Sequence, residues 1–101
     1  MLLNPGKELT YNGTKYTYPK VKLIYNAGNN FFSHQQDLNE LARAMQVVDT
    51  VIVQDCWWNG SARMADIVLP ATTTMERNDI SSGGTYNIDK VFAMRQVVAP
   101  V

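Results

Sequence analysis

Hydrogen-bonding side chains follow three apolar runs of this chain, and their spacing indicates a nucleotide site. The polar segments are residues 28–30 after the run 21–25, residues 54–55 after 51–53, and residues 70–79 after 67–69. Gly28 can take a positive φ or admit a close backbone approach. Asp55 follows Gly28 by 27 residues, roughly the twenty-odd residues at which dinucleotide-binding folds place the acidic residue that holds a ribose. Since the loop has one glycine and no G-x-G-x-x-G pattern, spacing alone predicts only a candidate site.

The apolar runs predict the sheet that would position these groups. A short continuous apolar run, such as residues 51–53, is typical of a parallel strand that is buried on both faces. Residues 37–45 place Leu38, Leu41 and Met45 at helical spacing, and Asp37 stands near the helix start. We therefore expect residues 21–25, 51–54 and 67–69 to be parallel neighbours. The helix should pack on one face through those three side chains, in a right-handed βαβ unit.

The ends of the chain have weaker patterns. Residues 8–11 and 15–18 flank Asn12-Gly13, a dipeptide that favours a type I′ hairpin. Residues 81–84 predict a flexible turn, and residues 91–98 an ambiguous last strand. The predicted fold class is thus α/β, a Rossmann-like parallel sheet with an N-terminal β-hairpin. With 101 residues the chain is expected to form a single domain over residues 1–101.

Several candidate residues have two interpretations. His34 is either packed at a helix N-terminus or donates to a ligand phosphate beside the helix dipole. Asp55 either binds a nucleoside or accepts from the backbone of Trp57 or Trp58 in a local turn. The two tryptophans either cover a core edge or, less commonly, stack on a base. Arg77 either belongs to a capped helix start with a solvated face or binds an anion or base.

Two further contacts are expected near the second loop. Ser61 should cap a short helix over residues 62–65. Arg63 and Asp66 should form a weak surface ion pair.

Composition excludes several classes of function. Nine basic and nine acidic residues give a net charge of zero, which argues against a nucleic-acid or anionic-membrane partner. No apolar run approaches the roughly 20 residues of a membrane span, and the N-terminus has no signal-peptide pattern. One histidine and one cysteine make a self-contained metal site improbable, so no metal-ligating residue is expected.

Three segments carry a resemblance to a known family. Residues 24–37 are IYNAGNNFFSHQQD, residues 50–55 are TVIVQD, and residues 61–79 are SARMADIVLPATTTMERND. Together they resemble the molybdopterin oxidoreductases of the dimethyl sulfoxide reductase family, particularly the trimethylamine N-oxide, dimethyl sulfoxide and biotin sulfoxide reductases. The ADIVLPATT-ERND run is the most specific part. Asn29, Phe31 and Gln35 depart from the residues that are usual in the family.

The resemblance implies a cofactor and a set of residues that contact it. Family members bind molybdenum through two molybdopterin guanine dinucleotides (bis-MGD), each held largely by a Rossmann-like domain. By motif position, the cofactor-binding residues would be Gly28, Asn30 and His34 in the first loop, Gln54 and Asp55 at the nucleoside end, and Arg77 in the third loop.

The resemblance also implies that this is part of a longer enzyme. The family's serine ligand to molybdenum, its second dinucleotide domain and its substrate funnel are not in this sequence. We expect a segment without catalytic residues of its own, inactive alone and without bound cofactor. Its partners would be the rest of the reductase chain, an N-oxide or S-oxide substrate and an electron donor. A periplasmic location is implied by kinship only. The alternatives are a free-standing nucleotide-binding module and a ligand-free folded remnant.

Overall fold

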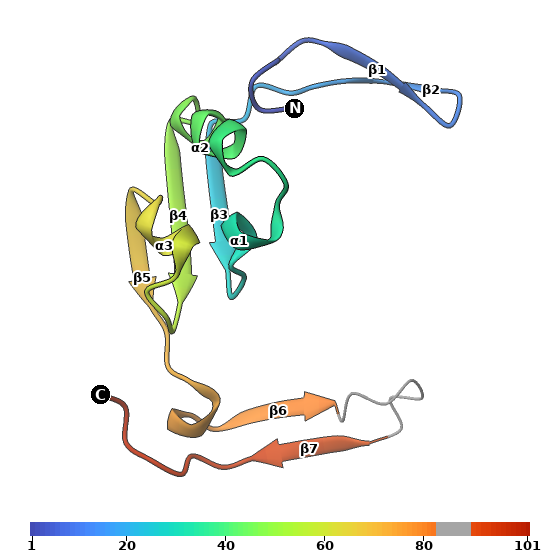
Figure 1. Cartoon of the computed structure of the whole chain (residues 1–101). Coiled ribbons are helices and arrows are strands. Elements are labelled where there is room, and N and C mark those ends of the chain that lie inside the picture. The colour runs from blue at the N-terminus through green and yellow to red at the C-terminus, as the bar shows by residue number, and fades with distance from the viewer. Residues whose placement is uncertain (83–89) are drawn as a thin grey trace. The chain divides into compact units, whose positions relative to one another are not determined.

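The computed structural model describes residues 1–82 and 90–101 of the chain (Figure 1). They form two compact units, Met1–Pro70 and Ala71–Val101, and each is described by itself below. That residues 1–101 form a single domain stays a prediction.

A three-stranded parallel sheet is the centre of the first unit. Its strands are β3 (Leu23–Ala27), β4 (Thr50–Asp55) and β5 (Ile67–Pro70), in the order β3-β4-β5. Ile24 pairs with Val51, and Val53 pairs with Val68. The predicted parallel neighbours and the α/β fold class are therefore confirmed, although the first strand begins at Leu23 and not at residue 21.

Helix α2 (Leu38–Gln46) begins where its sequence predicts. Asp37 is the N-cap, and its carboxylate accepts from the Glu40 N–H at 3.0 Å. This bond satisfies one of the backbone donors that the first turn leaves without a partner. Two four-residue helices, α1 (Phe31–His34) and α3 (Gly60–Arg63), complete the crossovers.

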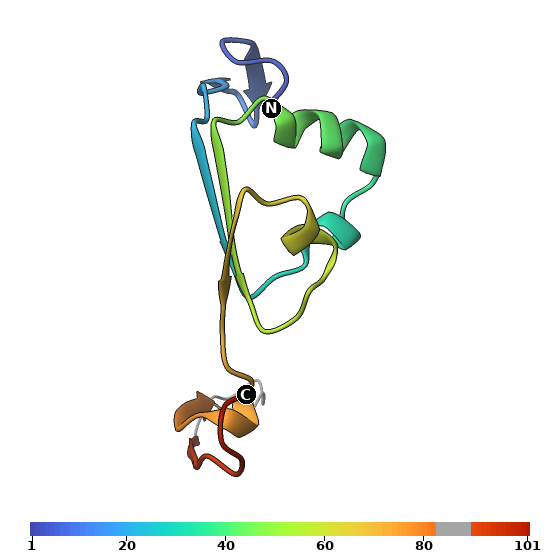
Figure 2. The ribbon, with the colours of Figure 1, turned by 90° about the vertical axis from the view of Figure 1, so that its left-hand side faces the viewer.

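All three helices lie on one side of the sheet, as Figure 2 shows. Both crossovers step across the sheet in the same direction, β3 to β4 to β5. Right-handed connections that step the same way place their helices on the same face. This handedness decides which side chains become the core.

The core lies between the helices and the sheet. Its buried members are Met45, Val48, Val51, Val53 and Ala62. Leu41 packs against this cluster, as predicted. Leu38 does not, because it precedes by one turn the first α2 residue that packs against the core, and it is 44% exposed. The prediction for Leu38 is therefore wrong.

Within Met1–Pro70, no helix covers the opposite face of the sheet (Figure 2), contrary to the prediction of strands buried on both faces. We call it the open face. The register places these apolar side chains on it: Leu23, Tyr25, Ile52, Ile67 and Leu69. Four of the five are between 41% and 54% exposed. Apolar strands predicted burial correctly for one face only, because the helices described here cover only one.

An N-terminal hairpin is confirmed, formed by β1 (Glu8–Tyr11) and β2 (Thr14–Thr17). Its turn residues Asn12 and Gly13 both have positive φ, 48° and 76°, as a type I′ turn requires. The second strand begins one residue earlier than predicted.

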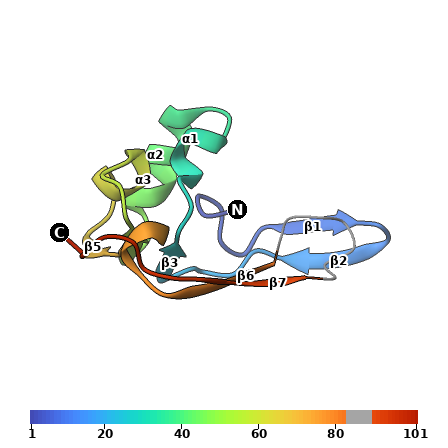
Figure 3. The same cartoon turned by 90° about the horizontal axis from the view of Figure 1, so that it is seen from below.

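The second unit contains another antiparallel pair, β6 (Asp79–Ser82) and β7 (Val91–Met94), which lie side by side in Figures 1 and 3. Strand β7 confirms the first half of the strand predicted over residues 91–98, because the strand ends at Met94. The turn predicted at residues 81–84 is wrong at Ser81 and Ser82, because both pair with β7. Its other two residues lie outside the described part of the chain. Across residues 1–82 and 90–101, no helix has the length and apolar character needed to cross a membrane.

Candidate functional site

Two of the predicted loops meet at the carboxyl edge of the sheet. The Gly28 N–H, one residue beyond β3, donates to the Gln54 carbonyl oxygen at 2.8 Å. Ala27 is the register partner of Gln54. The bond and the register therefore hold residues 28–30 beside residues 54–55, at the sheet edge where open α/β folds bind ligands.

Gly28 gives the first loop its path. Its φ is +67°, and a Cβ built on it would meet no atom within 4 Å. The residue is therefore glycine for its backbone conformation and not for packing, and the space beside it is open. The Asn26 side-chain amide donates to the Asn29 carbonyl oxygen and closes the loop from within.

Asn30 is tied to a serine thirty-one positions along the chain. Its Oδ1 accepts from the Ser61 hydroxyl at 3.0 Å and from the Ser61 N–H at 3.3 Å. The Ser61 hydroxyl in turn accepts from the Phe32 N–H at 3.0 Å. Ser61 is fully buried. The Asn30 side-chain oxygen therefore positions α1 against α3, while its amide donates to the Ser33 hydroxyl at 2.9 Å. A cofactor contact of Asn30 stays a prediction.

Ser61 does not have the capping role that its position in the sequence indicated. The cap of α3 is Asn59, whose Oδ1 accepts from the Ala62 N–H at 3.0 Å. Ser61 lies inside the helix, where its hydroxyl reaches α1. No local pattern could have revealed this contact, because it joins residues from different crossovers.

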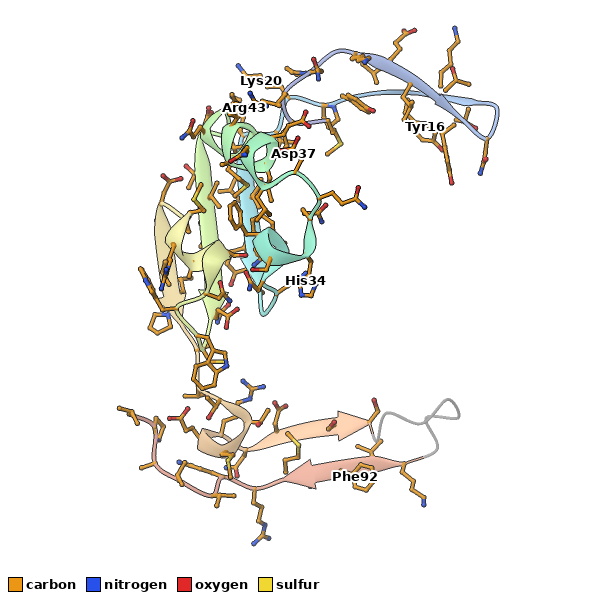
Figure 4. The ribbon with its side chains drawn as sticks, in the orientation of Figure 1. Tyr16, Lys20, His34, Asp37, Arg43 and Phe92 are labelled. Carbon is orange, nitrogen blue, oxygen red and sulfur yellow. The ribbon has the colours of Figure 1, made fainter. Side chains whose placement is uncertain are left out.

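His34 lies exposed on the last turn of α1, and Figure 4 shows its ring directed away from the ribbon. The packed alternative is therefore wrong. The nearby N-terminus of α2 is capped by the carboxylate of Asp37, so a phosphate would meet a like charge there. A cofactor contact of His34 stays a prediction.

Asp55 closes a turn after β4. Its Oδ1 accepts from the Trp57 N–H at 3.0 Å, and its Oδ2 accepts from the Asn59 amide at 2.8 Å. The Trp57 N–H chiefly, with the Asn59 amide, holds the pKa of the Asp55 carboxyl below its usual value. The local-turn interpretation is thus present in the structure. The carboxylate is ionised at neutral pH and can only accept hydrogen bonds.

The neighbours of Asp55 are exposed. Trp57 and Trp58 are 69% and 65% exposed, so the expectation that they cover a core edge is wrong. The turn at Asp55 carries both beyond the end of β4 and away from the buried cluster. Gln54 is half-buried, and its Oε1 accepts from the Tyr25 hydroxyl.

Arg77 lies in the second unit and is engaged locally. Its Nε donates to Asp79 Oδ2 at 2.7 Å, and its Nη1 donates to the Thr72 carbonyl oxygen at 2.9 Å. Beside it, the N–H and hydroxyl of Thr73 both donate to Glu76 at 2.7 Å, at the start of the 3₁₀ turn η1 (Thr74–Glu76). The capped-helix interpretation is confirmed, and a cofactor contact of Arg77 stays a prediction.

Asp66 does not pair with Arg63 as expected. Its Oδ2 accepts from the Val51 N–H at 2.8 Å, and its own N–H donates to the Val51 carbonyl oxygen at 2.9 Å. The expected ion pair is therefore replaced by a bond that fixes the start of β5 to the start of β4. In the described ranges, no group of three or more His, Cys, Asp or Glu side chains could hold a metal ion.

Comparison with known proteins decides the family. The model of the molybdopterin oxidoreductase family matches residues 2–101. The chain belongs to the molybdopterin oxidoreductases. It is 54% identical over 100 residues to the trimethylamine-N-oxide reductase of Haemophilus influenzae, an alignment that covers 99% of this chain and 12% of that protein.

Other molybdopterin oxidoreductases match as well. The chain is 54% identical over its whole length to a dimethyl sulfoxide/trimethylamine N-oxide reductase of Cereibacter sphaeroides, and 46% identical to a biotin sulfoxide reductase of that organism. It spans 12% and 13% of the lengths of these two relatives. The resemblance stated from the sequence is confirmed, and the family implies a molybdopterin cofactor.

Proposed function

We propose that this chain is the part of a molybdenum-dependent N-oxide or S-oxide reductase that holds one molybdopterin guanine dinucleotide. The observation that carries the proposal is the hydrogen bond from Gly28 to Gln54, which places two polar loops side by side at the carboxyl edge of a parallel sheet. Ligands of open α/β sheets bind at this edge. Membership of the molybdopterin oxidoreductases supplies the class of ligand.

The residues of the edge suit a guanine dinucleotide. The ionised carboxylate of Asp55 only accepts hydrogen bonds, so it suits ribose hydroxyls or the N1–H and N2–H₂ donors of guanine. Its present partners are one backbone N–H and one amide, and a carboxylate has about four lone-pair sites. The open space beside Gly28 admits a close approach to the backbone. Gln54 adds an amide, and Asn30 and His34 complete the first loop. Arg77 is proposed as a cofactor contact by its motif position alone.

The chain's contribution to the reaction is binding and orientation. The bound molybdenum cofactor supplies the two-electron oxygen-atom transfer chemistry, and the protein holds it in place. The remainder of the reductase chain, an N-oxide or S-oxide substrate and an electron donor complete the proposed enzyme, in a periplasmic location. Residues 1–101 by themselves are expected to be inactive.

The proposal is tested by titrating the chain with guanosine diphosphate. The chain has two tryptophans, which follow Asp55 by two and three residues, so intrinsic fluorescence reports directly on this edge. The wild-type chain should give a saturable change. In Asp55→Ala the affinity should fall about tenfold to a hundredfold, because a hydrogen bond to a charged group contributes roughly 1.5–3 kcal/mol.

Asp49→Ala is the matched control, because it removes an exposed carboxylate at the opposite end of the same strand. Its affinity should equal that of the wild type. If the wild-type chain does not saturate, it is a ligand-free remnant and the proposal fails. If Asp55→Ala binds guanosine diphosphate with wild-type affinity but has a lower melting temperature, the Asp55 carboxylate stabilises the turn and does not bind the nucleotide.

A further inference from the structure

We infer that Asn59 is a positioning residue of the nucleotide site, whose side chain holds the carboxylate of Asp55 in the orientation that meets the nucleoside. The inference rests on the proposed function, because that function gives Asp55 its ligand. Asn59 follows Asp55 by four residues and is half-buried. It lies where the turn after β4 ends and α3 begins, so its side chain can act on both.

Each polar atom of the Asn59 side chain has one partner. Its Nδ2 donates to Asp55 Oδ2 at 2.8 Å, and its Oδ1 accepts from the Ala62 N–H at 3.0 Å. One partner is an ionised carboxylate that can only accept, and the other is a backbone group that can only donate. Together they allow a single orientation of the amide, with its nitrogen toward Asp55. The cap of α3 therefore determines which atom Asn59 presents to the carboxylate.

The Asn59 amide fixes the plane of the Asp55 carboxylate. The Trp57 N–H binds Oδ1 at 3.0 Å, and this bond by itself would leave the group free to rotate about it. The second bond, to Oδ2, removes that freedom. A carboxylate has about four lone-pair sites, so sites on both oxygens remain for a ligand and point in fixed directions. An acceptor that is already oriented loses less conformational freedom when a ligand binds.

Helix α3 gives the amide a rigid support. Ser61 is fully buried in it, and the Ser61 hydroxyl donates to Asn30 Oδ1 at 3.0 Å. A Cβ built on Gly60 would lie 3.2 Å from Phe32 Cδ1, so α3 packs closely against α1. A shift of α3 on α1 would move the Asn59 amide with it. The first loop and the carboxylate of the second loop are thus connected through this one side chain.

Two substitutions separate positioning from capping. Serine and aspartate are about as good as asparagine at an N-cap, so Asn59→Ser and Asn59→Asp keep α3 capped and remove the donor to Asp55. In the guanosine diphosphate titration at neutral pH, Asn59→Ser should bind about threefold to tenfold more weakly than the wild type, the equivalent of one hydrogen bond. Asn39→Ser is the matched control. Asn39 is exposed on α2, which lies toward the starts of the strands (Figure 1), so its affinity should be unchanged.

Asn59→Asp gives a result that a capping role would not give. At neutral pH the two carboxylates repel each other, and the affinity should fall at least about tenfold. As the pH falls, the pair takes up one shared proton. The Trp57 N–H chiefly holds the pKa of Asp55 low, so this proton goes to the introduced side chain, which then donates to Asp55 as the amide does. The affinity relative to the wild type should therefore recover by about pH 4.

A cap alone would respond to pH in the opposite direction, because an ionised carboxylate is the form that suits a helix N-terminus. The N–H and thiol of Cys56 also lower the pKa of Asp55, and they are the same in every variant. Carbon NMR of the Asp55 carboxyl without nucleotide tests the contact directly. Its pKa should be higher in Asn59→Ser than in the wild type, because the Asn59 amide is one of the groups that lower it.

The possible outcomes separate the inference from the proposed function. An unchanged pKa of Asp55 in Asn59→Ser overturns the inference alone. Wild-type nucleotide affinity in both Asn59→Ser and Asn59→Asp, or a relative affinity of Asn59→Asp that falls further with pH, does the same and leaves Asn59 as a cap. If the wild-type chain does not saturate with guanosine diphosphate, the proposed function fails and the inference fails with it.

Discussion

Ser61→Ala should be among the most destabilising single-atom deletions in the first unit. The Ser61 side chain is fully buried, and its hydroxyl makes two bonds, one from the Phe32 N–H and one to Asn30 Oδ1, both at 3.0 Å. Alanine removes both. Asn30 Oδ1 keeps the Ser61 N–H at 3.3 Å, whereas the Phe32 N–H loses the side-chain oxygen that it binds.

The expected loss of stability in Ser61→Ala follows from the Phe32 N–H, which loses its acceptor. A buried donor that loses its acceptor costs about 1–3 kcal/mol, more than the net value of an average hydrogen bond. We therefore expect the free energy of unfolding to fall by about 1–3 kcal/mol. Each kcal/mol corresponds to roughly 4–8 °C in melting temperature for a domain of this size.

Urea unfolding followed by far-UV circular dichroism measures the effect. Ser33→Ala is the matched control, because Ser33 is exposed and its hydroxyl only accepts from the Asn30 amide at 2.9 Å. It should cost less than about 0.5 kcal/mol. The double variant with Asn30→Ala should show a coupling of about 0.5–3 kcal/mol. Equal losses in Ser61→Ala and Ser33→Ala, or strict additivity with Asn30→Ala, would refute the reasoning.

Three further predictions concern the loops. Gly28→Ala should cost about 1–2 kcal/mol, because its φ of +67° is the left-handed conformation, and Gly28→Asn should cost less in the same urea titration. Asp37→Ala should lower the melting temperature through the loss of about 1 kcal/mol of N-cap energy, whereas Asp37→Asn keeps a cap oxygen and should lose less than half of that. The pKa of Asp55 is lowered from its ordinary 3.8, chiefly by the Trp57 N–H. Its stabilising contribution is therefore complete above that value and is lost as the pH falls through the folded-state pKa. Urea midpoints measured from about pH 5 down to pH 3 should fall more steeply in the wild type than in Asp55→Asn.

The sequence was sufficient to predict the parallel sheet, the helix α2 and the first hairpin, because each has a local signal. Continuous apolar runs mark β4 and β5, helical spacing and Asp37 mark α2, and Asn12-Gly13 marks the turn. The same patterns placed residues 28–30 and 54–55 at one edge, and the structure brings those loops together through the bond from Gly28 to Gln54.

What the sequence could not predict depends on contacts between distant residues. Helix α1 has four residues, too few for a helical period to show. The burial of Ser61 depends on Asn30, thirty-one positions away. Strand β6 is polar and forms because β7 pairs with it. Apolar strands indicate that a sheet is covered. The exposure of the open face could not be read from them, because it depends on both crossovers stepping in the same direction and so placing their helices on the same face.

The topology of the first unit also sets the order in which it can fold. Strands β1 and β2 are joined by two residues, so their pairing is local and should form within about 1–10 μs. Strand β3 cannot pair with β4 until the whole of α1 and α2 has been closed into a loop, and such non-local pairings are slow. During that interval β3 and β4 are unpaired apolar segments of the kind that associate between chains. Refolding yield should therefore fall with rising protein concentration, and the loss should arise at the parallel strands and not at the hairpin.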